Sequence, residues 1–233
     1  METIILAGGF GTRLQKVVKD LSKPMASIND RPFLEYLMNY LKNYGIKRVI
    51  LSLGYKHEII KNHFQNSFNS IEIEYAVEKE ALGTGGGIKY AFDLLKGDSA
   101  LVVNGDTLFN IDLKKFIDFH NNKKSAFSIA LRFLDNVERF GTVEIDKQNR
   151  IIDFHEKNAQ KGKGYINGGV YLINKNFFDD LGFADKFSIE KDCFEKFYKT
   201  EKFYGFPADD YFIDIGIPED LLKAQDDFRR FEY

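Results

Sequence analysis

The first half of the chain alternates short apolar runs with amphipathic segments, and this alternation limits the possible folds more than any other feature of the sequence. In the segment 32–45, Leu34, Leu37, Met38 and Leu41 recur with the spacing of one helix face. Strands that alternate with helices form mostly parallel sheets with right-handed crossovers. The expected strands are 3–8, 48–54, 71–78, 99–106 and 125–134, and the expected helices are 32–45, 57–64, 85–95 and 113–123.

The pattern changes after residue 134. Two strand-like runs, GTVEID and RIIDFHEK, flank the turn signal KQN and predict a hairpin. A strand pair or one long strand is expected over 164–174, and helices are expected over 189–198 and 218–231. Because no linker-like or repetitive segment interrupts the 233 residues, a single α/β domain is expected. Its cleft should lie at the C-terminal ends of the parallel strands.

Charge and composition exclude several classes of protein. A net charge of -2 offers no surplus of positive charge for nucleic acid or an anionic membrane surface. No apolar run approaches the roughly 18–20 residues that span a bilayer, and the N-terminus lacks a signal-peptide pattern. Cys193 is the single cysteine, so no internal disulfide or cysteine zinc cluster is expected. We expect a cytoplasmic protein without nucleic-acid or membrane partners, and the sequence indicates no oligomeric state.

The first expected strand leads into LAGGFGTRLQ, which places three glycines and an arginine between Gly8 and Arg13. Glycine lets backbone N–H groups approach an anion, and α/β folds bind phosphates in such loops. The spacing fits neither the Walker motif nor the dinucleotide fingerprint, which would need glycine at Leu14. Arg13 and Lys23 add a planar fork and a mobile point charge for phosphate oxygens. A plain tight turn beside two solvated cations is the alternative.

Two aspartates stand at predicted strand ends beside glycine. Asp106 ends the run VVNGD, and Asp214 lies in YFIDIGIP. Mg²⁺ binds one or two carboxylates together with phosphate oxygens and water, so both positions suit a hard cation in a cleft. A helix N-cap or a turn is the alternative for either aspartate. Sequence spacing does not indicate whether the two side chains meet.

For three further polar segments, a purely structural role is the alternative to a role in ligand binding. Glu156 and Lys157, in FHEKN, could form an exposed ion pair worth about 0–1 kcal/mol. Asn167 and Gly168, in INGGVY, could form a turn or bulge, and Thr84, in ALGTGGGIKYA, could cap a helix. The four histidines follow no metal-ligand spacing and are expected to be structural or exposed.

These segments together resemble the sugar-phosphate nucleotidyltransferases. LAGGFGTRL…KPM is similar to the signature of that family, and EALGTGG, NGD, FHEK, INGGVY and DIGIPED follow in the family's order. The resemblance implies a Rossmann-like, three-layer α/β domain with a mixed, mostly parallel central sheet. It also implies that about residues 1–134 bind the nucleotide and about residues 135–233 the sugar phosphate. Asn158 stands where the family often has proline, which leaves the turn after Lys157 open.

The resemblance implies a role for each site position. The nucleotide is expected to contact Leu6, Ala7, Gly8, Gly9, Gly11, Thr12, Arg13, Lys23, Glu78, Gly83, Thr84 and Asp106. The sugar phosphate is expected to contact Gly105, Glu156, Lys157, Asn167 and Gly168. The expected catalytic residues are Arg13, Lys23, Asp106 and Lys157, and the expected ligands of Mg²⁺ are Asp106 and Asp214. A carboxylate at Glu78 accepts from both N1–H and the exocyclic amine of guanine, which favours GTP.

The implied reaction is attack of a sugar 1-phosphate oxygen on the α-phosphorus of GTP, with release of pyrophosphate. Because the nucleophile is already anionic, catalysis consists of positioning and charge neutralisation. The runs KPM, EALGTGGGIKYA and NGDTLFNIDL are most similar to bacterial guanylyltransferases of D-glycero-α-D-manno-heptose 1-phosphate, which make GDP-heptose for surface polysaccharides. Mannose 1-phosphate guanylyltransferases and N-acetylmuramate 1-phosphate uridylyltransferases are the nearest alternatives. A non-catalytic, nucleotide-sensing subunit is the alternative outside the enzymes.

Overall fold

The computed structural model describes residues 1–9, 22–54, 56–155 and 162–231. The strands are β1 (Glu2–Leu6), β2 (Ser27–Ile28), β3 (Arg31–Pro32), β4 (Arg48–Leu53), β5 (Ser67–Phe68), β6 (Ile71–Val77), β7 (Ser99–Asn104), β8 (Thr107–Phe109), β9 (Phe127–Leu134), β10 (Thr142–Ile145), β11 (Ile151–His155), β12 (Gly164–Asn174), β13 (Phe203–Ala208) and β14 (Phe212–Asp214). The helices are α1 (Phe33–Asn43), α2 (His57–Phe64), α3 (Gly83–Phe92), α4 (Leu113–Lys123), α5 (Phe177–Asp180), α6 (Glu195–Phe197) and α7 (Pro218–Asp227). Three short helical turns complete the set: η1 (Lys23–Met25), η2 (Ile189–Phe194) and η3 (Phe228–Arg230).

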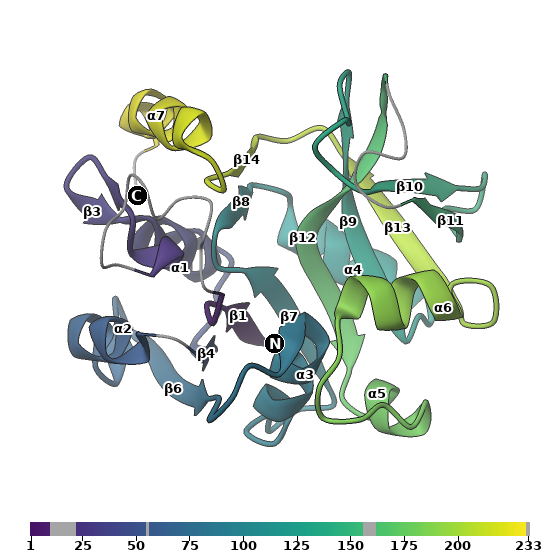
Figure 1. Ribbon diagram of the computed structural model, residues 1–233, viewed down its shortest axis with the longest axis horizontal. Helices are drawn as coiled ribbons and strands as arrows, with labels where there is room; N and C mark the ends of the chain where they lie inside the picture. The colour runs from purple at the N-terminus through teal and green to yellow at the C-terminus, as the bar shows by residue number, and fades with distance from the viewer. Residues whose placement is uncertain (10–21, 55, 156–161, 232–233) are drawn as a thin grey trace.

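Ten of the described strands form one mixed sheet (Figure 1). Its centre is parallel, because β1 lies between β4 and β7, and β6 pairs with β4. β12 joins β7 in the antiparallel direction and also pairs with β9, which is parallel to β13. The predicted hairpin is formed by β10 and β11, and β10 also pairs with β12. The mixed, mostly parallel central sheet is therefore confirmed.

Helices cover both faces of the sheet, which gives the expected three layers. Successive strand residues point to opposite faces. Ile5 and Val103 accordingly lie in a core shared with α1, α2, α4 and α7, whereas Ile4 and Val102 lie in a core shared with α3, α5 and η2. Because both faces are covered, residues on both faces of β1, β4 and β7 are mostly apolar.

Several element boundaries differ from the sequence prediction for local reasons. α1 begins at Phe33 because Pro32 is its extended N-cap, and Gly45 adopts a positive φ of 77° shortly after its end. The predicted helix over 189–198 is instead the π-helical turn η2 followed by the short α6. The predicted helix over 218–231 ends as α7 at Asp227 and continues as the 3₁₀ turn η3.

Two groups that the sequence left without a chemical role are packed in the interior. His120 of α4 is buried, with Nδ1 at 2.8 Å from the Ser128 hydroxyl and Nε2 at 3.3 Å from the Asn174 side-chain oxygen. Burial lowers the pKa of His120 and favours the neutral ring, which suits the structural role expected. Cys193 belongs to η2, and its side chain is buried in the core. Among the described residues, no helix is long and apolar enough to cross a membrane.

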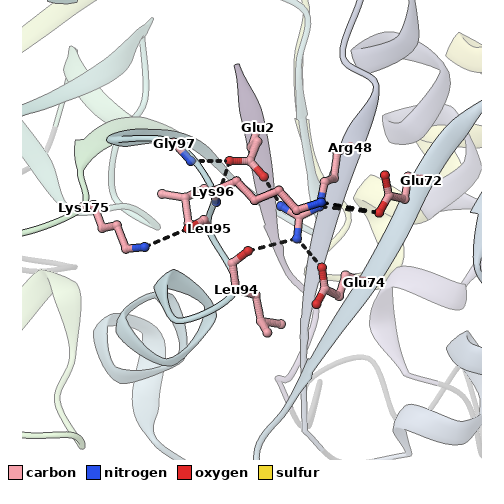
Figure 2. Close-up of polar contacts among 9 residues, drawn as sticks. All are labelled: Glu2, Arg48, Glu72, Glu74, Leu94, Leu95, Lys96, Gly97 and Lys175. Atoms are coloured by element: carbon pink, nitrogen blue, oxygen red, sulfur yellow. Dashed lines mark hydrogen bonds and ion pairs between the residues drawn. The ribbon is translucent and has the colours of Figure 1, made fainter.

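An ion-pair network ties three central strands together at their N-terminal ends. Figure 2 shows the Arg48 guanidinium, at the start of β4, in contact with the carboxylates of Glu2 in β1 and Glu74 in β6. Arg48 also donates to the Leu94 carbonyl at 2.9 Å, and Glu2 accepts from the Gly97 N–H at 2.7 Å. The network therefore joins the sheet to the segment that follows α3.

Replacement of Arg48 by methionine is expected to lower the free energy of unfolding by about 3 kcal/mol, because the nearly buried Glu2 carboxylate loses its positively charged partner. The Arg48 and Glu2 side chains are 9% and 15% exposed. Urea denaturation measures the change. Arg229→Met, which removes an exposed arginine paired with Asp226, is the control and is expected to change stability by less than about 0.5 kcal/mol. Equal losses in the two variants would contradict a specific role for the network.

Candidate active site

Two cavities meet at the C-terminal ends of the central parallel strands. The first cavity has a volume of about 380 Å³ and the second about 500 Å³. Asn104, the last residue of β7, lines both. The position is the one expected for a ligand site in an open α/β sheet.

The first cavity brings together the glycine-rich opening and residues from five other places in the chain. Its lining residues are Leu6, Ala7, Gly8, Gly9, Lys23, Pro24, Ser52, Glu78, Ala81, Gly83, Thr84, Asn104, Asp106 and Gly216. All the expected nucleotide contacts that the structure describes are in this set. Gly11, Thr12 and Arg13 lie outside the described residues.

The glycines after β1 allow the backbone to pass close to the neighbouring strand. A Cβ atom added to Gly8 would lie 3.0 Å from the Gly54 nitrogen, and one added to Gly54 would lie 2.9 Å from the Gly8 oxygen. The chain leaving β1 therefore lies against the end of β4, with Ala7 N–H donating to the Ser52 carbonyl at 2.9 Å. On the other side, Gly105 N–H donates to the Leu6 carbonyl at 2.8 Å. Both contacts hold residues that line the first cavity.

A small antiparallel pair, β8 with β14, brings the two expected metal ligands together. Asp106 lies in the turn between β7 and β8, and Asp214 is the last residue of β14, opposite Thr107 in the register. The Lys23 ammonium contacts the Asp106 carboxylate and lies 3.5 Å from Asp214 Oδ1. Asp106 also accepts from the Thr107 hydroxyl at 3.2 Å. Asp106 lines the first cavity and Asp214 the second, so this trio stands at their junction.

The trio fits a hard divalent cation. Lys23 demonstrates that a positive charge is accommodated between the two carboxylates, and its side chain is only 12% exposed. Within the described residues, no group of three or more histidine, cysteine, aspartate or glutamate side chains is arranged to hold a metal. A cation on Asp106 and Asp214 would therefore take further oxygens from water and phosphate, as Mg²⁺ does.

Glu78, directly after β6, places a carboxylate in the wall of the first cavity. Its Oε2 accepts from the Leu82 N–H at 3.0 Å, and its Oε1 lies 3.5 Å from the Ser52 hydroxyl. Burial raises the pKa of Glu78, and these hydrogen bonds oppose the shift. The carboxylate is held in place by local donors and lines the cavity as an acceptor.

The start of α3 is tied to the segment before η2. The N–H groups of Gly85 and Gly86 donate to the Phe187 carbonyl at 3.1 and 3.2 Å, so these amides already have an acceptor. This helix terminus therefore attracts an anion less than one with unpaired N–H groups would. Thr84 does not cap the helix. Its hydroxyl donates to the Glu190 carboxylate at 2.8 Å and accepts from the Ile189 N–H at 3.0 Å.

The second cavity is built from the second half of the chain together with Asn104 and Thr107. Its lining residues are Asn104, Thr107, Phe140, Gly141, Thr142, Val143, Phe154, His155, Asn167, Gly169, Ser188, Glu190, Lys191, Phe194, Glu195, Phe212 and Asp214. Of the expected sugar-phosphate contacts, Asn167 lines this cavity. Gly105 and Gly168 are buried and line neither of the two cavities. Glu156 and Lys157 lie outside the described residues, directly after His155.

Asn167 is held by its own strand. Its Oδ1 accepts from the Gly169 N–H and its Nδ2 donates to the Tyr171 hydroxyl, both at 2.9 Å. An amide fixed in this way presents a defined orientation to the cavity, as recognition of sugar hydroxyls requires.

Sequence reasoning missed several residues that line the cavities. The sequence could have indicated Asn104 as a site residue, because it is a polar residue at the end of an apolar strand, directly before Gly105 and Asp106. Ser52 likewise ends an apolar run. Glu190 gave no such signal, because its contact with Thr84 crosses more than a hundred positions of sequence.

The fold is shared with nucleotidyl transferases. The chain matches the Nucleotidyl transferase family over residues 2–230 and belongs to that family. It is 48% identical to a D-glycero-alpha-D-manno-heptose 1-phosphate guanylyltransferase of Aneurinibacillus thermoaerophilus, with 99% of this chain and 100% of that protein covered. A protein of the same description from Campylobacter jejuni is 49% identical, with 94% and 96% covered. The crystal structure of HddC from Yersinia pseudotuberculosis complexed with GMP-PN has a TM-score of 0.87 at 42% identity, with 97% and 99% covered.

Proposed function

We propose that this protein transfers GMP from GTP to D-glycero-α-D-manno-heptose 1-phosphate, giving GDP-heptose and pyrophosphate. The observation that carries the proposal is the position of Lys23, Asp106 and Asp214 at the junction of the two cavities. The near full-length similarity to heptose 1-phosphate guanylyltransferases supports the choice of both substrates. The product would serve surface polysaccharide synthesis, and the reaction would take place in the cytoplasm.

The two cavities support an assignment of one substrate to each. The first, lined almost entirely by residues before 107, would hold GTP, and the second, lined mainly by residues after 139, would hold the sugar phosphate. This division agrees with the proposed halves 1–134 and 135–233. Glu78 would accept hydrogen bonds from guanine, and Asn167 would bind sugar hydroxyls.

Charge neutralisation is the main task of the side chains between the substrates. Mg²⁺ held by Asp106 and Asp214 would neutralise phosphate charge and orient the nucleotide and sugar phosphates. Lys23 would bind phosphate oxygens from the first cavity. We also assign Arg13 to the β- and γ-phosphates and Lys157 to the sugar phosphate. The attacking oxygen is already ionised, so no residue needs to act as a general base.

The proposal is tested by pyrophosphate release over a grid of substrates with Mg²⁺. GTP, UTP, ATP, CTP and dTTP would each be combined with the 1-phosphates of D-glycero-D-manno-heptose, mannose, glucose and N-acetylmuramate. Release with GTP and the heptose phosphate above all other pairs is the expected result. Preferred release with mannose 1-phosphate or another pair would overturn the substrate assignment. Absence of release throughout, despite GTP binding, would overturn the enzymatic function and favour a nucleotide sensor.

A further inference from the structure

The Lys23 ammonium lies between the carboxylates of Asp106 and Asp214, and the surrounding chain leaves room for it there. A Cβ added to Gly216 would lie 3.1 Å from Lys23 Nζ and 2.8 Å from Asp214 Oδ1, so glycine at this position leaves room for the ion pair. The lysine backbone is fixed by the turn η1, in which Ala26 N–H donates to the Lys23 carbonyl at 3.0 Å and Pro24 and Met25 are buried. The ammonium is therefore delivered to this position from an anchored backbone.

We propose that Lys23 acts as an internal counter-cation that holds the metal position until nucleotide arrives. In the protein without substrates, the ammonium neutralises Asp106 and Asp214 and competes with a divalent cation for them. When a nucleoside triphosphate enters the first cavity, its phosphates give Lys23 other anionic partners and give the cation further oxygen ligands. Metal and nucleotide then bind together. The inference rests on the proposed function, because it requires a triphosphate in the first cavity.

The charges at the junction favour binding of the metal together with the nucleotide rather than before it. Two carboxylates and one ammonium leave a net charge of about -1, so a divalent cation added without nucleotide would share its ligands with a like charge a few ångströms away. Loss of the ammonium would leave two neighbouring carboxylates without that counter-charge. Such a pair attracts a divalent cation strongly because their mutual repulsion is relieved on binding. Lys23 lines the first cavity, so phosphate oxygens bound there lie within reach of its flexible side chain.

The test is Mn²⁺ binding in the absence of nucleotide, followed by the electron paramagnetic resonance signal of the free ion. Lys23→Met is expected to bind Mn²⁺ about 10–100-fold more tightly than the parent protein. Lys23→Arg, which keeps the positive charge, is expected to bind Mn²⁺ as weakly as the parent does. If the methionine variant does not fold, Lys23→Gln removes the same charge and provides the same comparison.

Lys89 offers a matched control, because its ammonium also lies between two aspartates, Asp179 at 3.4 Å and Asp185 at 3.6 Å. Those carboxylates are well exposed, and Lys89→Met is expected to leave Mn²⁺ binding as in the parent. Equal Mn²⁺ affinity in the parent and in both neutral Lys23 variants would overturn the counter-cation role. A parent protein that neither binds GTP in the presence of Mg²⁺ nor releases pyrophosphate would instead overturn the proposed function.

Discussion

Asp106→Asn is expected to lower the rate of pyrophosphate release by about 10²–10³-fold, the loss seen when one electrostatic stabiliser of a developing charge is removed. Asparagine keeps the size of the side chain and an oxygen that can accept from the Thr107 hydroxyl, now at 3.2 Å from Asp106. The carboxylate charge facing Lys23 and the metal position is lost. The rate is measured with saturating GTP, sugar phosphate and Mg²⁺, and urea denaturation checks that the fold is kept.

Asp112→Asn provides the matched control for this change. Asp112 caps α4 by accepting from the N–H groups of Lys114 and Lys115, and it lines neither cavity. Asparagine is an equally good cap, so both stability and rate should stay close to those of the parent. A fully active Asp106→Asn enzyme would remove Asp106 from the metal site.

Glu78→Gln is expected to lower kcat/KM for GTP by about 100-fold, because glutamine has one acceptor oxygen and its NH₂ group would face one of the two guanine N–H donors. ITP, which lacks the exocyclic amine, separates base recognition from other effects. The parent should prefer GTP to ITP clearly, and the variant should nearly lose that preference. Glu80→Gln, an exposed change two positions along the same segment, is the control. An unchanged ratio of GTP to ITP in Glu78→Gln would assign base recognition to other residues.

The same glutamate predicts a pH dependence of GTP use. Burial raises the pKa of Glu78, so its carboxyl takes up a proton at a higher pH than an exposed glutamate does. The protonated form has lost acceptor capacity toward guanine. As pH falls through the raised pKa, kcat/KM for GTP should therefore fall in the parent, and the preference over ITP should fall with it. In Glu78→Gln the preference should be independent of pH in this range.

Periodicity predicted the central strands and the long helices because their burial is set by residues close together in sequence. β1, β4 and β7 are apolar on both faces, and α1 and α4 each have one apolar stripe. The small elements around the site lacked such signals. β8 and β14 have three residues each and are stabilised by each other, while β13 contains Gly205 and Pro207, which sequence rules read as loop.

The candidate site was predictable to the extent that its residues lie at the ends of apolar strands. Asp106 and the glycines after β1 follow such strands, so their common location was expected from the parallel sheet. The meeting of Asp214 with Asp106 depends on the β8–β14 pairing, which spans about half the chain and has no local signature. The contact of Thr84 with Glu190 was equally unpredictable, because hydrogen bonds between distant segments leave no pattern in the sequence.

The central place of β1 has a consequence for how the chain is made. β1 is translated before both of its neighbours, yet it lies between β4 and β7, and Thr3 is paired with Leu101. At a synthesis rate of about 5–20 residues per second, the second neighbour of β1 is completed roughly 5–20 s after β1 itself. Until β7 is complete, at least one edge of the apolar strand β1 is unpaired, and an unpaired strand edge favours pairing with other chains. Ribosomes that stop before β7 would therefore release an aggregation-prone fragment.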